Sequence, residues 1–110
     1  MLFDTHAHYD DHKFDCDRDE VIENAYRSGV SLIINASSDY RSLELGMHLI
    51  RKFEFMYAAV GIHPHNVGDM SEDDLEVISR LSENHKVVAI GEIGLDYYYD
   101  NSPRDVQQHW

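Results

Sequence analysis

Histidine and carboxylate side chains occur in a few short motifs whose spacing suggests metal chemistry. His6 and His8 form an H-x-H pair, and residues i and i+2 of an extended segment point to the same side. Both imidazoles can therefore reach one divalent ion, for which imidazole is a common ligand. Asp4 is placed to hydrogen-bond a ligand histidine and to fix its tautomer. An isolated H-x-H pair also occurs in exposed loops, so the neighbouring sequence has to decide between these interpretations.

Glu92 lies in the apolar sequence A-I-G-E-I-G-L-D at 89–96. A carboxylate in such a run is costly unless it is paired or bound to a cation. A strand-end glutamate paired with Arg or His is the alternative, but we expect Glu92 to be a catalytic metal ligand, because a carboxylate can bridge two cations. Two ions about 3.5–4 Å apart can clamp an in-line displacement at phosphorus. The sequence thus predicts two divalent ions and does not decide between Mg, Mn and Zn. Asp96, just after the same strand, is expected to support the ligands from outside the metal site.

A second histidine motif, His63-Pro64-His65, follows the apolar run at 55–62. His63 is a candidate for contact with the phosphate or scissile group of a substrate, and a histidine hydrogen-bonded at a strand end is an equal alternative. Three consecutive tyrosines at 97–99 can stack on a base or cover the site, although packing of the loop is expected for at least two of them. The remaining histidines are expected not to be ligands: His12, His48, His85 and His109.

Short apolar runs alternate with longer amphipathic runs along the chain. We expect strands at 2–4, 30–36, 55–62 and 87–93, and helices at 17–28, 39–50, 71–81 and from 102 onward. Asp17 and Glu20 resemble a capping box, and Gly29 is suited to end the first helix. Continuous apolar strands between helices indicate a parallel sheet. The carboxyl ends of such strands meet on one face, so the candidate histidines and acids are expected to converge there.

The fold class expected is α/β, a TIM (β/α)8 barrel. A complete barrel needs roughly 250 residues, and these 110 residues supply about the first four β/α units. We therefore expect residues 1–110 to be the N-terminal half of a single barrel domain, truncated within its last helix at Trp110. A four-stranded parallel sheet has open edges, so self-association through those edges is expected.

Composition excludes several other classes of protein. The formal net charge is −12, with 21 acidic and nine basic residues, whereas a protein that grips nucleic acid by surface charge is basic. Metal ions bound at the site would supply positive charge there and would weaken this argument against nucleic-acid binding. No apolar run reaches the ~20 residues of a membrane span, and the N-terminus lacks the basic region of a secretory signal. Cys16 is the sole cysteine and cannot form an internal disulfide, so a cytoplasmic location is expected.

Four motifs together resemble the TatD family of metal-dependent deoxyribonucleases, within the amidohydrolase superfamily. They are D-T-H-A-H-Y-D at 4–10, D-R-D-E-V-I at 17–22, A-A-V-G-I-H-P-H at 58–65 and V-A-I-G-E-I-G-L-D-Y-Y at 88–98. The resemblance implies a TIM barrel and a divalent-metal phosphodiesterase acting on DNA, typically as a 3′-to-5′ exonuclease, in which metal-activated water attacks the phosphodiester.

Carried over by position, the resemblance makes His6 and His8 ligands of one metal and Glu92 the bridging carboxylate. It places His63 on the substrate or phosphate side of the site. The family's remaining ligands are two later histidines and a late aspartate, beyond position 110. The resemblance therefore implies that this chain alone is inactive.

Two alternatives stay open from the sequence. The H-x-H pair and the strand-end glutamate are equally compatible with another amidohydrolase-type enzyme that cleaves a small amide, lactone or phosphoester. The acidic charge mildly favours that alternative, because DNA would have to be attracted by the metals alone. The other alternative is a non-catalytic half-barrel.

Overall fold

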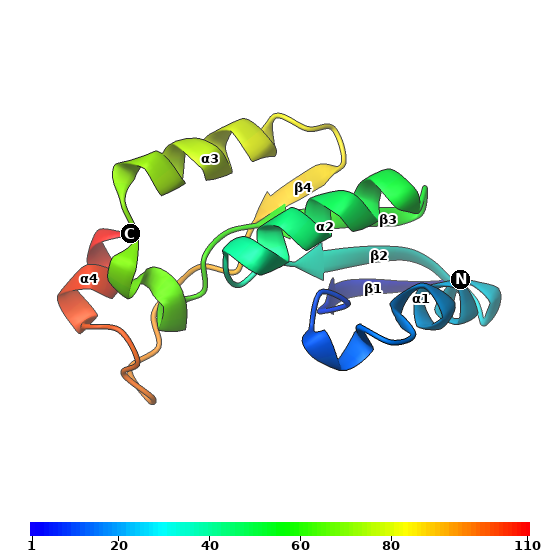
Figure 1. Cartoon of the computed structure of the whole chain (residues 1–110), viewed down its shortest axis with the longest axis horizontal. Helices are drawn as coiled ribbons and strands as arrows, with labels where there is room; N and C mark the ends of the chain where they lie inside the picture. Colours follow the sequence, from blue (N-terminus) through cyan, green and yellow to red (C-terminus); the bar gives the residue numbers. More distant parts are fainter.

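A single sheet of four parallel strands forms the framework of the computed structural model, which describes residues 1–110. The strand order is β1-β2-β3-β4, so consecutive strands are neighbours (Figure 1). The bounds are β1 (Leu2–Ala7), β2 (Val30–Ala36), β3 (Met56–Val60) and β4 (Val87–Ile90). A helix connects each strand to the next, as parallel neighbours require. The predicted parallel β/α arrangement is confirmed.

Four α-helices and two short 3₁₀-helices accompany the strands. They are α1 (Arg18–Arg27), α2 (Tyr40–Lys52), α3 (Glu72–Ser82), α4 (Arg104–His109), η1 (His12–Phe14) and η2 (Pro64–Asp69). Asp39 caps α2 by accepting from the Ser42 backbone N–H, and Ser42 Oγ accepts from the Asp39 N–H in return. The capping box predicted at Asp17 and Glu20 is wrong, because the Asp17 side chain makes no cap hydrogen bond. No helix has the length and apolar character needed to cross a membrane.

The hydrophobic core lies between one face of the sheet and helices α1, α2 and α3. Ile22 of α1, Ile50 of α2 and Ile78 of α3 pack in one cluster with the strand residues Ile33 and Met56. Figure 1 shows α2 lying along β2 and β3, and α3 beside β4. All three helices therefore cover the same face of the sheet.

The opposite face is uncovered and concave. Ile34, Ala36, Ala59 and Ala89 line an open cavity of about 580 Å³ there, and the two edge strands expose large apolar residues, with Ile90 52% exposed. In a closed barrel this face is the interior. The self-association expected through the open edges stays a prediction.

The strand ends differ slightly from those expected, and this changes where the candidate residues lie. The sequence predicts a first strand at 2–4, but β1 extends to Ala7, so His6 lies within β1 and His8 directly follows it. Glu92 was placed within the fourth strand but lies two residues beyond Ile90, where β4 ends. In β1 the strand continues through polar residues past the apolar run, whereas apolar residues continue past the end of β4 at Ile90. The apolar pattern alone therefore does not mark these ends.

Candidate metal centre

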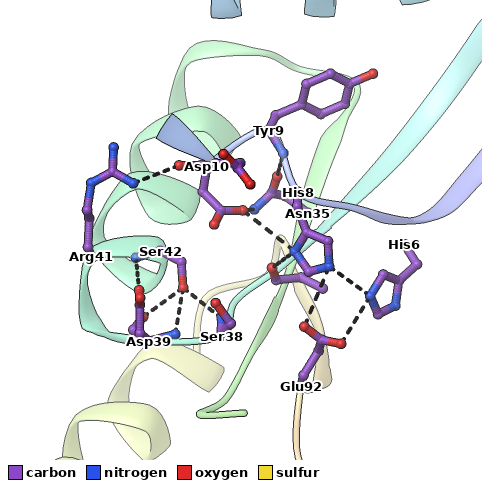
Figure 2. Close-up of polar contacts among 12 residues, drawn as sticks. His6, His8, Tyr9, Asp10, Asn35, Ser38, Asp39, Arg41, Ser42 and Glu92 are labelled. Carbon is purple, nitrogen blue, oxygen red and sulfur yellow. Dashed lines mark hydrogen bonds and ion pairs between the residues drawn. The ribbon is translucent and has the colours of Figure 1, made fainter. Parts of the chain in front are cut away.

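His6, His8 and Glu92 converge at the carboxyl ends of β1 and β4 (Figure 2). The Nε2 atoms of His6 and His8 lie 3.1 Å apart. Glu92 Oε1 is 3.3 Å from His6 Nε2, and Oε2 is 3.5 Å from His8 Nε2. All three side chains thus direct a potential ligand atom at one small volume, as the sequence predicted.

This convergence depends on the path of the chain after β4. β1 and β4 are the two edge strands of the sheet, and three flat inter-strand spacings would separate them by about 14 Å. Glu92 lies two residues beyond β4, and its backbone N–H donates to the carbonyl oxygen of Ser37, just after β2, at 2.8 Å. The segment after β4 therefore carries Glu92 toward β1, where its Oε1 lies 3.3 Å from His6 Nε2.

The imidazole of His8 is oriented by a backbone carbonyl. His8 Nδ1 lies 3.0 Å from the carbonyl oxygen of Ala36, at the end of β2. A carbonyl only accepts, so Nδ1 carries the proton and the lone pair of Nε2 points toward Glu92. This is the tautomer that a metal-ligating histidine needs.

A buried amide network holds the segment that follows His8. Asn35 is fully buried in β2; its Oδ1 accepts from the Tyr9 backbone N–H at 2.7 Å, and its Nδ2 donates to Asp10 Oδ1 at 2.7 Å. Burial raises the pKa of the Asp10 carboxyl, more than the hydrogen bond from Asn35 lowers it. Sequence reasoning missed Asn35, although a lone amide within the apolar run V-S-L-I-I-N-A was a usable signal.

Asp4 supports His6 differently from the way expected. Its Oδ1 accepts from the backbone N–H of His6 at 3.1 Å, two residues along the chain. The expected bond to a histidine ring is absent, because Asp4 and His6 share one strand and the backbone N–H is the nearer donor. Asp4 therefore fixes the position of the His6 backbone.

His63 lies beside the three-residue cluster in a polar cavity of about 380 Å³ that Glu92 and His8 also line. Its Nδ1 accepts from the His65 backbone N–H at 3.1 Å, so the neutral ring carries its proton on Nε2. Burial, and secondarily the nearby His65, lowers the pKa of His63. His63 is therefore a neutral hydrogen-bond donor at neutral pH.

Asp96 pairs with His65 rather than with the three-residue cluster. Its Oδ1 also accepts from the backbone N–H groups of Tyr98 and Tyr99, at 2.9 and 3.1 Å. These backbone bonds, that from Tyr99 foremost, and the bond to His65 lower the pKa of the Asp96 carboxyl. Asp96 thus joins the loop after Glu92 to the start of η2.

This lowered pKa predicts how acid affects stability. The folded state binds the Asp96 proton less tightly than the unfolded chain does, so the ionised carboxylate stabilises the fold at pH values above the ordinary pKa of an aspartate, about 3.9. That contribution is lost as the pH falls through the lower, folded-state pKa. We expect the difference in unfolding free energy between wild type and Asp96→Asn to shrink between about pH 5 and pH 2. Urea unfolding across this range measures it. Asp105→Asn, at an exposed position, is the control, and an equal pH dependence in both variants would contradict the prediction.

Gly61 permits the close approach of the backbone that carries Glu92. A Cβ at position 61 would lie 2.7 Å from the Glu92 carbonyl oxygen and 2.8 Å from the Gly91 carbonyl carbon. Both contacts are with backbone, which cannot rotate away. The Glu92 N–H also donates to the Ser37 carbonyl at 2.8 Å, which ties the same segment to the end of β2.

We expect Gly61→Ala to displace Glu92 and to destabilise the fold by about 1–3 kcal/mol, the usual range for overpacking. Urea unfolding measures the stability, and Zn²⁺ titration measures the effect on the site. Gly68→Ala is a matched control, because its Cβ would meet only Ser102 Oγ, at 3.6 Å. Unchanged stability and Zn²⁺ affinity in Gly61→Ala would show that the backbone contact is unimportant.

A family model described as TatD related DNase matches residues 3–110. The chain belongs to the TatD-related DNase family. It is 47% identical over 108 residues to a Bacillus subtilis (strain 168) protein named uncharacterized metal-dependent hydrolase YabD, covering 98% of this chain and 42% of that protein. It is 31% identical over 108 residues to the 3′-5′ ssDNA/RNA exonuclease TatD of Cronobacter sakazakii, covering 98% of this chain and 41% of that enzyme.

A solved structure of the TatD family supports the same placement. The crystal structure of YjjV, a TatD homologue from Escherichia coli K12, matches this chain with a TM-score of 0.84 and 33% sequence identity. The match covers 98% of this chain and 42% of YjjV. The prediction of a partial TIM barrel is confirmed. The chain spans about two fifths of the length of the TatD relatives it matches.

Proposed function

We propose that this chain contributes the first part of the active site of a divalent-metal-dependent deoxyribonuclease that hydrolyses DNA phosphodiesters from the 3′ end. The observation that carries the proposal is the convergence of His6, His8 and Glu92 from opposite edges of the sheet. Membership of the TatD-related family and the exonuclease name of the Cronobacter relative support the choice of substrate.

The three donors fit a divalent cation. Two imidazole nitrogens and one carboxylate oxygen are a known ligand set for a catalytic Zn²⁺ with an open position, and Mn²⁺ accepts the same donors. Both carboxylate oxygens of Glu92 face the two histidines, so that Glu92 would have one oxygen for the ion held by His6 and His8 and one for a second ion. A bound ion would polarise a phosphoryl oxygen and acidify a water nucleophile. We propose two ions, with Zn²⁺ or Mn²⁺ favoured over Mg²⁺, which prefers oxygen ligands.

The other predicted residues take supporting roles in this proposal. The neutral His63 donates from Nε2 to a phosphate oxygen of the substrate and holds it next to Glu92. Asp4 fixes the His6 backbone, and Asp96 fixes His65, whose backbone N–H sets the tautomer of His63. Each of these roles follows from a contact to a proposed ligand or to the substrate-side histidine.

The test uses a chimaera in which this chain replaces the matching 42% of YabD, because the chain spans only that share of its relatives. We expect hydrolysis of 3′-labelled single-stranded DNA that stops with chelator and returns with added Mn²⁺ or Zn²⁺. Native YabD is the matched control for the shared C-terminal part. DNA hydrolysis that persists in chelator would contradict the proposal.

A second candidate is a metal-dependent hydrolase of a small amide, lactone or phosphoester. The net charge of −12 favours it, as do the names of YabD and of the Escherichia coli relative YjjV, which specify metal-dependent hydrolases without a substrate. Small esters, lactones and amides tested beside DNA separate the two. Turnover of a small substrate without cleavage of DNA would establish this second candidate.

We also propose a cytoplasmic location. Cys16 is exposed and unpaired, and free exposed thiols persist in reducing compartments. Fractionation of cells that express the chain would test this location.

A further inference from the structure

Two tyrosines remain exposed next to His65. Tyr98 is 87% exposed and Tyr99 is 65% exposed. Tyr97, in contrast, packs against α4: the Arg104 guanidinium lies 4.6 Å from its ring centroid, and its hydroxyl accepts from Gln108 at 2.6 Å. Tyr97 therefore packs the loop against α4, whereas Tyr98 and Tyr99 keep most of their surface exposed.

The loop holds these two exposed rings in place. The Asp96 carboxylate binds the backbone N–H groups of both Tyr98 and Tyr99. The buried Gln107 of α4 accepts from the Asp96 N–H at 2.7 Å and donates to the Ser102 carbonyl, also at 2.7 Å. Rings presented by an ordered backbone lose less freedom on binding a partner than rings on a loose loop.

The exposed rings continue a row of rings that starts in the polar cavity. The His63 and His65 centroids lie 4.3 Å apart, and both histidines line the cavity with Glu92. His65 meets Tyr99 edge-on with centroids 5.6 Å apart, and Tyr99 meets Tyr98 at 4.7 Å. The row therefore leads from the proposed phosphate position to the surface.

We propose that Tyr98 and Tyr99 form a stacking subsite for an unpaired nucleobase of the strand whose phosphodiester is held at the His63–Glu92 cavity. This inference rests on the proposed nuclease function and names the part of the substrate that the loop recognises. With a net charge of −12, the chain cannot hold a strand by charge on its surface. Aromatic faces bind bases without positive charge and with little sequence preference.

The chemistry of stacking requires an unpaired base. Inside a duplex, both faces of a base are covered by its neighbours, and at a blunt end only the outer face of the terminal pair is open. An unpaired terminal base can turn either face to the rings, so the subsite favours single-stranded ends over blunt duplex ends.

The test measures binding by the purified chain of a fluorescein-labelled oligothymidylate, in chelator so that no hydrolysis occurs. Fluorescence anisotropy gives the affinity. We expect Tyr98→Ala and Tyr99→Ala to bind roughly 5- to 150-fold more weakly, the range for loss of one base stack. The phenylalanine variants keep the ring and are expected to bind within about twofold of wild type. Tyr26→Ala, a change at an exposed tyrosine of α1 that stacks on Phe55, is the matched control.

An abasic probe separates stacking from a general loss of structure. The abasic probe is an oligothymidylate with one terminal base removed. We expect wild type to bind the abasic probe more weakly than the intact probe. We expect Tyr98→Ala and Tyr99→Ala to bind the two probes equally well. The proposal is overturned if the alanine variants bind the intact probe like wild type, or if wild type does not bind it. It is also overturned if removal of the base weakens binding by the alanine variants as much as it weakens binding by wild type. The two rings would then serve contact with protein instead.

Failure of this subsite and failure of the nuclease proposal give different results. The binding assay contains no metal, whereas the chimaera assay measures metal-dependent hydrolysis. Hydrolysis with no effect of the alanine variants on binding overturns the subsite alone. Abasic-sensitive binding without hydrolysis of DNA overturns the nuclease proposal alone.

Discussion

Glu92→Gln in the YabD chimaera is expected to lower kcat/KM for single-stranded DNA by at least about 1,000-fold. The amide has the same shape as the carboxylate, but it lacks the charge needed to hold cations beside His6 and His8. Metal ions contribute several kcal/mol to stabilising charge in such transition states, and each 1.36 kcal/mol corresponds to a factor of ten in rate. Loss of the proposed shared ligand is therefore expected to remove most of the catalysis.

The assay compares initial rates at saturating Mn²⁺ for the chimaera and its variants. Glu83→Gln, at the exposed end of α3, has the same change of charge and is expected to keep full activity. The unfolding temperature of Glu92→Gln is expected to match that of the parent. The Glu92 carboxylate makes ion pairs only with His6 and His8. A Glu92→Gln enzyme with more than a tenth of the parental activity would exclude Glu92 as a shared ligand.

Asn35→Ala is expected to destabilise the chain by about 2–6 kcal/mol. The substitution leaves two groups without partners: the Tyr9 backbone N–H and the buried Asp10 carboxylate. An unsatisfied buried polar group costs about 1–3 kcal/mol, and more when it is charged. Since Tyr9 and Asp10 directly follow His8, we also expect weaker binding of Zn²⁺.

Urea unfolding of four proteins measures this: wild type, Asn35→Ala, Asp10→Ala and the double variant. We expect the double variant to be less destabilised than the sum of the single ones, because removal of both partners leaves no unpaired carboxylate. Asn24→Ala, on the exposed face of α1, is the control and is expected to change stability by less than about 0.5 kcal/mol. Additive effects at Asn35 and Asp10 would show that the two side chains are not coupled.

Much of the fold was predictable because local signals agree with the tertiary arrangement. The apolar run at 30–36 is strand β2, and Gly29, with a φ of +103°, follows the end of α1 as predicted. The alternation of strands and helices requires parallel strands, and the carboxyl ends of parallel strands meet at one edge of the sheet. That rule predicts from the sequence that His6, His8 and Glu92 lie close together.

The remaining features depend on strand register and curvature, which no local pattern encodes. The carbonyl of Ala36 orients His8 because the end of β2 lies beside the end of β1, and any residue supplies a carbonyl. The binding of Asp4 to backbone rather than to a ring depends on where β1 ends. The different environments of Tyr97 and Tyr98 depend on α4, which contacts one of two adjacent identical residues.

Titration of Zn²⁺ into the purified chain, followed by calorimetry and by the imidazole NMR signals of its histidines, tests most directly whether His6, His8 and Glu92 bind a metal ion. We expect saturable binding that shifts the signals of His6 and His8. Binding is expected to be lost in His6→Ala and in Glu92→Gln, and to be kept in His48→Ala, an exposed position in α2. Absence of saturable binding, or binding that these two variants leave unchanged, would contradict the claim that this edge of the sheet is a metal centre.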